Sequence, residues 1–257
     1  MYKYFLNTFL ILLIFVPFIF AQQPPQLNEY LGSRITFNTG INFIAVKDDY
    51  ISDERYTGYS PSFLFDWTKI NDSSGFHLSF GIINSAKVTN YNVSANIIEA
   101  TLDLAYVYNI GDLNIFNRKI MFYLGPAPEL FFHIRTQDIA RGAIMDAYSA
   151  AFLFSAGVRL DMIMPLSKKW QFEGNIYSSF LSLGGKLIDF ENTNTSMFKI
   201  LTLFTGLSYN LNLGVRYGLF NNISLKAGYE FGFVRISAWD FFISAKDNFN
   251  LSLTYSF

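Results

Sequence analysis

The sequence predicts a closed antiparallel transmembrane β-barrel of about ten strands, with eight or twelve strands as alternatives. Three observations predict it: an apolar targeting segment at the start, a body of alternating apolar and polar residues, and a chain that ends on an aromatic strand. From Phe249 to Phe257 every odd position is apolar and every even position is polar. A period of two is typical of a β-strand whose two faces meet different surroundings.

The composition agrees with strands that face lipid. Of the 257 residues, 51% are hydrophobic and only 15% are charged, and aromatic residues reach 19%. A low charge content without a long apolar run in the body is expected when alternation distributes the lipid-facing surface over many strands. The net charge of -1 argues against a nucleic-acid partner, which prefers a basic surface. The absence of cysteine excludes disulfides and thiolate metal sites.

Residues 1–21 have the features of a signal peptide. Lys3 provides a positive charge, the segment 5–20 is almost wholly apolar, and Ala21 is a small residue suited to cleavage. The alternative is a permanent N-terminal helix. That segment is interrupted by Pro17 and is shorter than the roughly 20 residues that a transmembrane helix needs. We therefore expect removal of the signal after Ala21.

Residues 22–32 are expected to form a short periplasmic leader, and residues 33–257 an outer-membrane β-barrel of ten segments. Their apolar rows lie in 35–43, 63–67, 76–82, 98–110, 120–134, 152–164, 170–180, 201–219, 223–233 and 249–257. Short connections at 70–74, 111–117, 165–169 and 220–222 alternate with longer polar ones, as at 47–60 and 184–197. This alternation is typical of barrels with periplasmic turns and external loops, and an even strand count places both termini in the periplasm.

Charged residues within the segments fall on the row opposite the apolar one. With the two histidines, these predicted lumen residues are Arg34, Asp66, His77, Glu99, Asp103, Glu129, His133, Arg159, Asp161, Glu173, Arg216, Lys226 and Glu230. A charge facing lipid at mid-depth costs roughly 2 to 4 kcal/mol, so a barrel must turn this row inward. A soluble β-sandwich, the alternative fold, would turn it outward into water. We expect a narrow or closed lumen of ion pairs with an excess of acids.

The rows, the signal, the turns and the terminal aromatic residues Tyr255 and Phe257 resemble those of the porin-like small outer-membrane β-barrel proteins of Gram-negative bacteria. The resemblance covers residues 33–257. It implies a barrel surrounded by outer-membrane lipid, and recognition of the terminal aromatic residues by the barrel-assembly machinery. The expected function is a narrow or closed porin-like barrel with a structural role or a role mediated by its external loops, whose partner stays open.

The alternative function is an outer-membrane barrel enzyme that acts on lipid or peptide. Proteases of the omptin type use acidic residues and a histidine at the external rim. His77 and His133 both fall on the inward row and lie in no motif that matches such families. We therefore expect no catalytic residue, no metal site and no cofactor.

Pro126 and Pro128 stand two positions apart, so both missing N–H groups point toward the same neighbouring strand. The functional interpretation is a possible lateral gap in the wall, through which a lipid or an apolar solute could enter. The alternative is a local bulge or bend.

A hairpin centred between Asn71 and Asp72 would place Asp66 opposite His77. Direct cross-strand neighbours have Cβ atoms about 5 Å apart, close enough for a carboxylate to bind an imidazolium. This register predicts an ion pair between Asp66 and His77 near the periplasmic end of the lumen.

Overall fold

The computed structural model describes residues 31–48, 52–90, 93–115, 118–137, 147–189, 195–220, 222–237 and 242–257. The predicted signal peptide lies outside the described residues, as does the leader apart from its last two positions. The strands are β1 (Gly32–Asp48), β2 (Ser52–Ile70), β3 (Ser74–Asn90), β4 (Val93–Ile115), β5 (Arg118–Gln137), β6 (Ala147–Pro165), β7 (Trp170–Asp189), β8 (Thr195–Thr202), β9 (Gly206–Gly218), β10 (Ile223–Ile236) and β11 (Phe242–Ser256). Among the described residues, no helix is long and apolar enough to span a membrane.

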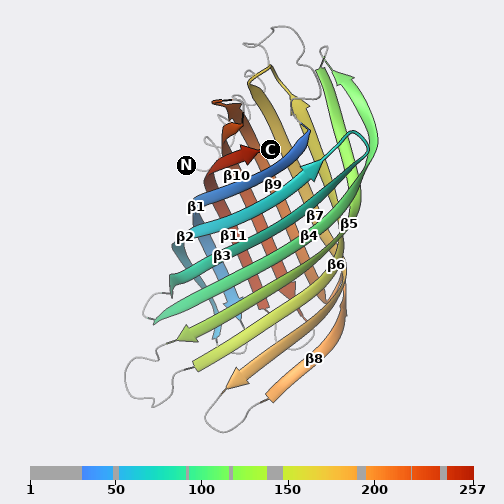
Figure 1. Cartoon of the computed structure of the whole chain (residues 1–257). Coiled ribbons are helices and arrows are strands. Elements are labelled where there is room, and N and C mark those ends of the chain that lie inside the picture. The colour runs from blue at the N-terminus through green and yellow to red at the C-terminus, as the bar shows by residue number, and fades with distance from the viewer. Residues whose placement is uncertain are drawn as a thin grey trace.

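The strands form one antiparallel sheet that closes on itself (Figure 1). The order is β6-β5-β4-β3-β2-β1-β11-β10-β9-β7, and β6 pairs with β7 to complete the ring. Both β9 and β8 pair with β7, β9 along its first part and β8 along its last part. Eleven elements therefore fill ten positions, which confirms the predicted closed barrel of about ten strands.

The eighth position departs from the prediction of one continuous segment over 201–219. A turn at residues 203–205 separates β8 from β9. Within it the Thr205 N–H donates to the Thr202 carbonyl oxygen at 2.9 Å, and the Thr205 hydroxyl accepts from the Thr202 N–H at 2.9 Å. These local bonds replace ladder bonds and interrupt the strand, and the alternation is broken at the same place, where Leu203 and Phe204 are adjacent and Thr205 is polar.

The two ends of the barrel differ. The turn end carries both ends of the barrel domain and the connections at 71–73, 166–169 and 219–222. There the Phe257 N–H donates to the Ser33 carbonyl oxygen at 3.0 Å. At the opposite end, the loop end, the expected long loops at 47–60 and 184–197 are wrong, because β1 and β2 pair as far as Lys47 and Arg55, and β7 and β8 pair over 184–188 and 195–199. The expected turn at 111–117 is also wrong in its bounds, because β4 and β5 pair over 111–115 and 118–122. Antiparallel neighbours satisfy each other's backbone groups, so pairing continues after the apolar rows end.

The apolar rows face outward as predicted, except in β8, where Leu201 points into the lumen and Ile200 points outward. Ile41 is 65% exposed, Phe63 54% and Leu104 42%. Aromatic rings gather on this face near the turn end. Trp67 packs on Phe76 with ring centroids 5.4 Å apart, and the Trp170 and Tyr217 rings lie at 4.7 Å. Such a belt of aromatic side chains marks the membrane interface of a barrel.

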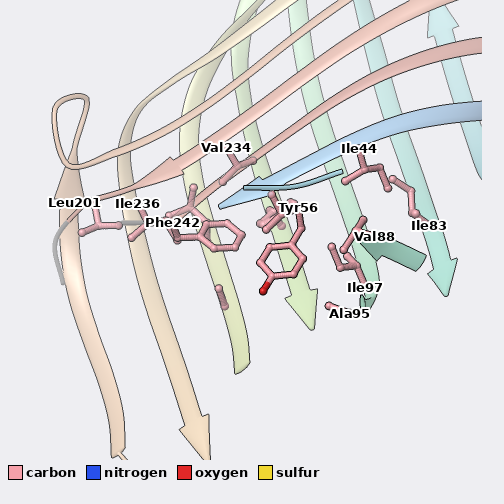
Figure 2. Packing of buried hydrophobic residues seen from close by; sticks show 14 residues of the cluster. Ile44, Tyr56, Ile83, Val88, Ala95, Ile97, Leu201, Val234, Ile236 and Phe242 are labelled. Atoms are coloured by element: carbon pink, nitrogen blue, oxygen red, sulfur yellow. The ribbon is translucent and has the colours of Figure 1, made fainter. Parts of the chain in front are cut away.

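Inward rows carry apolar side chains at the loop end. The loop-end cluster consists of Ile44, Val46, Tyr56, Ile83, Val88, Ala95, Ile97, Phe131, Ala151, Leu153, Leu201, Val234, Ile236 and Phe242. Figure 2 shows these side chains converging from strands around the wall. A second group, the turn-end cluster, consists of Ile70, Ala105, Val107, Met121, Tyr123, Ala127, Ile163 and Tyr177, with Leu31 packed against it. Buried apolar side chains therefore fill much of the interior, where the alternation predicts polar residues.

Candidate functional site: the charged layer of the lumen

The structure brings the predicted lumen residues together inside the barrel. All thirteen are buried or partly buried on inward rows, and eleven of them line one cavity. The exceptions are Glu99 and His133, which lie closer to the loop-end cluster. The cavity measures about 120 Å³, which leaves room for a few water molecules. We call these thirteen side chains and Lys246 the charged layer.

Glu173 on β7 connects three cationic side chains from other strands. Its Oε1 atom accepts from Arg34 Nη1 and from Arg216 Nε, both at 2.8 Å. Its Oε2 atom accepts from Arg216 Nη2 at 2.9 Å and lies 3.5 Å from Lys226 Nζ. The carboxylate thus ties β7 to β1, β9 and β10 across the lumen. Charge-assisted and bidentate hydrogen bonds are the strong ones, so this group braces the barrel near the turn end.

Asp161 on β6 forms the second ionic group. Arg159 Nε donates to its Oδ1 atom at 2.8 Å, and His77 Nε2 lies 3.0 Å from its Oδ2 atom. The His77 and Asp161 side chains are only 7% and 6% exposed. His77 on β3 therefore contacts a carboxylate on β6, and not the predicted one on the neighbouring strand β2.

The predicted pair of Asp66 and His77 is wrong. Asp66 lies opposite Ser79, so the hairpin register differs by two residues from the predicted one. The reason is the turn, where Asn71 Oδ1 accepts from the N–H groups of the second and third residues after it, at 3.0 and 2.7 Å. A shift of two preserves which face each side chain points to, so the inward assignment survives while the partner changes. Asp66 instead accepts from Asn38 Nδ2 at 2.5 Å.

Three further acids of the charged layer, Asp103, Glu129 and Glu230, lie closer to the loop end than Glu173 does. Asp103 and Glu129 are direct cross-strand neighbours on β4 and β5. Ser79 donates to Asp103 at 3.1 Å, and Ser208 donates to Glu129 at 2.5 Å. Hydroxyl groups thus solvate carboxyl groups that have no bulk water around them. Glu230 accepts from Asn210 Nδ2 at 3.2 Å.

Sequence reasoning missed Lys246, whose Nζ lies 3.4 Å from Glu230 Oε1. The last predicted segment began at Phe249, because Asp247 breaks the alternation just before it. Ser244, Lys246 and Asn248 nevertheless continue the polar row, and β11 does begin at Phe242. Lys246 reduces the acidic excess that the predicted list of lumen residues implied.

His133 is enclosed at the boundary with the loop-end cluster. Its Nδ1 atom lies 2.9 Å from Glu99 Oε1, and Ser244 donates to the same oxygen at 2.5 Å. Its ring meets Phe242 at a centroid distance of 4.9 Å and is only 1% exposed in its side chain. Its Nε2 atom has no hydrogen-bond partner among the described residues. A substrate at the rim would not reach this imidazole, nor that of His77.

The proline step on β5 lies where the ladder between β4 and β5 is interrupted. No residue of 125–128 is paired with β4, although the same residues remain paired with β6. Gly125 lies so close to β4 that a side chain there would collide with the backbone of Tyr106. Pro126 and Pro128 therefore remove hydrogen bonds without separating the strands. A lateral gap at this point stays a prediction.

The two residues of the predicted assembly signal, Tyr255 and Phe257, lie at the turn end. Tyr255 and Phe257 are 50% and 63% exposed on the outer face, with ring centroids 6.2 Å apart. Their role in assembly stays a prediction. Within the described part of the chain, no group of three or more His, Cys, Asp or Glu side chains could hold a metal ion.

Searches with protein-family models and among curated proteins find no match to this sequence. Among solved structures, the barrel is similar to the outer membrane protease OmpT from Escherichia coli. The TM-score is 0.57 at 8% identity, over 88% of this chain and 96% of that chain. It is also similar to the translocator domain of autotransporter NalP from Neisseria meningitidis, with a TM-score of 0.51 at 11% identity, over 88% of both chains. The chain thus has the fold of small outer-membrane β-barrel proteins, which supports an outer-membrane location.

Proposed function

We propose that the protein is a closed outer-membrane barrel that acts through its outer surface and its loop end instead of conducting solutes. The observation that carries this proposal is the filled interior. The charged layer leaves a cavity of about 120 Å³, and the loop-end cluster packs across the lumen beyond it. A conducting pore needs a continuous water path, and neither layer provides one.

The two groups of interior side chains oppose opening in different ways. Glu173 links three cations on three strands, so a path through the charged layer would separate several ion pairs. The loop-end cluster contains Phe131 and Leu153, which are at most 2% exposed. A path there would expose apolar surface to water, at about 25 cal/mol per Å².

We also propose that the turn end faces the periplasm and the loop end faces outward. The order of short turns at one end supports this orientation, since periplasmic connections of bacterial barrels are short. The exposed Tyr255 and Phe257 are then placed where the periplasmic barrel-assembly machinery could recognise them, as the family resemblance implies. Cleavage at a site inserted into residues 138–146, tested on intact cells and on spheroplasts with a permeabilised outer membrane, checks the orientation.

Recordings in planar bilayers test the closed state. Purified barrel whose insertion is verified by a fluorescent label should give no steady conductance above that of the bare bilayer. A stable ohmic conductance in the wild-type protein would overturn the proposal. As a matched control, a variant with Tyr56, Phe131 and Phe242 all changed to alanine removes the bulk of the loop-end cluster and should increase transient openings.

The enzyme alternative can be tested separately. Both described histidines are buried, so a rim site of the omptin kind would need groups other than these two. Lipid A and outer-membrane peptide profiles should be unchanged in a strain that lacks the gene. A specific altered lipid or an uncut peptide, restored by the wild-type gene, would favour the enzyme.

A further inference from the structure

One carboxylate lies on the outward face of the barrel. Asp247 on β11 belongs to the same row as Phe249 and Leu251, which are 52% and 67% exposed toward lipid. Its cross-strand neighbours are Phe43 on β1 and Phe231 on β10. The same cross-strand row continues through Tyr59 to the exposed Lys87, so Asp247 lies near the loop-end border of the lipid-facing surface, at the level of lipid head groups, where a charge is tolerated.

Among the described residues, Asp247 has one hydrogen-bond partner and no cationic partner. The Tyr229 hydroxyl donates to its carboxylate. Among the residues that the structure describes, none carries a cationic group within 4.0 Å of it, although Glu173, Asp161 and Glu230 in the lumen all have such partners. The carboxylate is therefore available to a positively charged group from outside the chain.

The neighbours of Asp247 shape an aromatic notch around it. An aspartate side chain is short, and in one cross-strand row the longer rings of Phe43 and Phe231 stand on either side. Phe43 is supported by Tyr59 at a centroid distance of 5.3 Å, and Tyr229 packs on Phe249 at 5.2 Å. A carboxylate between aromatic rings suits an organic cation, which can form an ion pair below and cation–π contacts at the sides.

An apolar groove lies on the same outward face, closer to the turn end, over β1 and β11 and the strands beside them. Its volume is about 470 Å³, and its lining includes Phe37, Thr39, Phe63, Leu225, Leu251 and Leu253. Leu251 and Thr39 lie four residues from Asp247 and Phe43, which corresponds to about 13 Å along a strand. The groove is thus within reach of an alkyl chain whose head group occupies the notch.

We infer that the Asp247 notch and the groove together bind an amphiphile with a single organic cation and an apolar chain. The ammonium group would contact Asp247 between Phe43 and Phe231, and the chain would lie in the groove. Ile41 and Phe249 separate the two parts, and this apolar stretch disfavours a phosphate next to the amine. An alkylammonium compound therefore fits better than a zwitterionic phospholipid. The inference does not depend on whether the lumen conducts.

NMR titration of the refolded barrel in nonionic bicelles tests the site. Dodecyltrimethylammonium should shift the amide signals around Asp247 and Leu251 saturably, while dodecyl sulfate, with the same chain and opposite charge, should not. Asp247→Asn should weaken the apparent affinity about tenfold. Asp112→Asn, which removes an acid near the turn end, should bind like the wild type. Equal affinity in Asp247→Asn would overturn the inference.

Two more comparisons are needed. One distinguishes binding of the ammonium head group from binding of the alkyl chain, and the other distinguishes a phosphate-free amine from a phospholipid. Thr39→Phe, which narrows the groove, should weaken dodecyltrimethylammonium but leave tetramethylammonium unaffected. Should Asp247→Asn fail to refold, Tyr229→Phe keeps the carboxylate and should retain binding, and loss of binding there would count against the site. Bicelles containing phosphatidylethanolamine should compete no better than those containing phosphatidylcholine. Strong competition by phosphatidylethanolamine would overturn the preference for a phosphate-free amine.

Discussion

The charged layer around Glu173 and the loop-end cluster around Phe131 occupy the same lumen and lie on the same inward rows, but they fill it with opposite chemistry. On β1 the inward row changes from Arg34 to Ile44 along one strand. In the charged layer, partners from distant strands neutralise one another. In the loop-end cluster, apolar side chains bury one another, and the buried Arg135 guanidinium lies over the Tyr56 ring at 4.1 Å.

This difference predicts different responses to mutation. Removing one member of a buried ion pair leaves its partner charged and unsatisfied, whereas removing part of an apolar cluster leaves a cavity that neighbours can partly fill. Changing the charge of one side chain should therefore destabilise the charged layer even at constant volume. The loop-end cluster should respond mainly to changes in side-chain volume.

The largest effect is expected for Glu173→Gln. It leaves Arg34, Arg216 and Lys226 without their shared carboxylate, and the expected loss is about 3 to 5 kcal/mol of unfolding free energy. Urea titration of the barrel in detergent micelles measures it. Asp112→Asn breaks a partly exposed pair with Lys119 and should cost below about 1 kcal/mol. Equal losses in the two variants would contradict a braced charged layer.

Phe131→Ala should destabilise the barrel by an amount that depends on collapse of the cavity. Phe131 is 2% exposed, and a buried Phe→Ala change costs about 3 to 5 kcal/mol when neighbours do not move. We expect the lower part of this range, and Phe131→Leu should recover most of the loss. The same urea titration gives both values. If Phe131→Leu were as unstable as Phe131→Ala, volume would not be the property that matters.

Two arginine substitutions on β4 compare the cost of a charge on the lipid-facing side with its cost on the lumen-facing side. Leu104→Arg places a charge on the outward face and should cost about 2 to 4 kcal/mol or block assembly. Thr101→Arg points inward beside Glu99 and Glu129 and should be tolerated better. The fraction of folded barrel in membranes and its urea midpoint measure the difference. Equal tolerance would contradict the facing of β4.

Deleting Phe257 should change stability least, because its ring is exposed and its N–H makes a single hydrogen bond to Ser33. The expected effect is slower insertion into the membrane, since the family resemblance implies that the terminal aromatic residue is recognised during assembly. Pulse labelling of outer-membrane fractions measures the rate. Normal insertion of the truncated chain would show that Phe257 is not recognised.

The sequence alone determined the fold class and the facing of the side chains, because a strand alternates its side chains strictly and each row is consistent over many residues. Thus Leu104 could be assigned outward and Glu173 inward without knowledge of any neighbour. The alternation fails as a guide where a local interaction interrupts it. Asp247 concealed the start of β11 and with it Lys246. The turn closed by Thr202 and Thr205 divided one expected strand into two and reversed the facing of its first part, so that Leu201 points inward.

Only the tertiary structure decided which side chains meet. His77 contacts Asp161 instead of Asp66 because Asn71 shapes the turn and moves the register by two residues, a change that leaves every facing intact. Glu173 reaches Arg34, 139 residues away, because the ring closes through β11 and β1. Facing is a local property of each strand, whereas partners depend on the accumulated register of all the hairpins and on closure, and no single segment of the sequence contains that information.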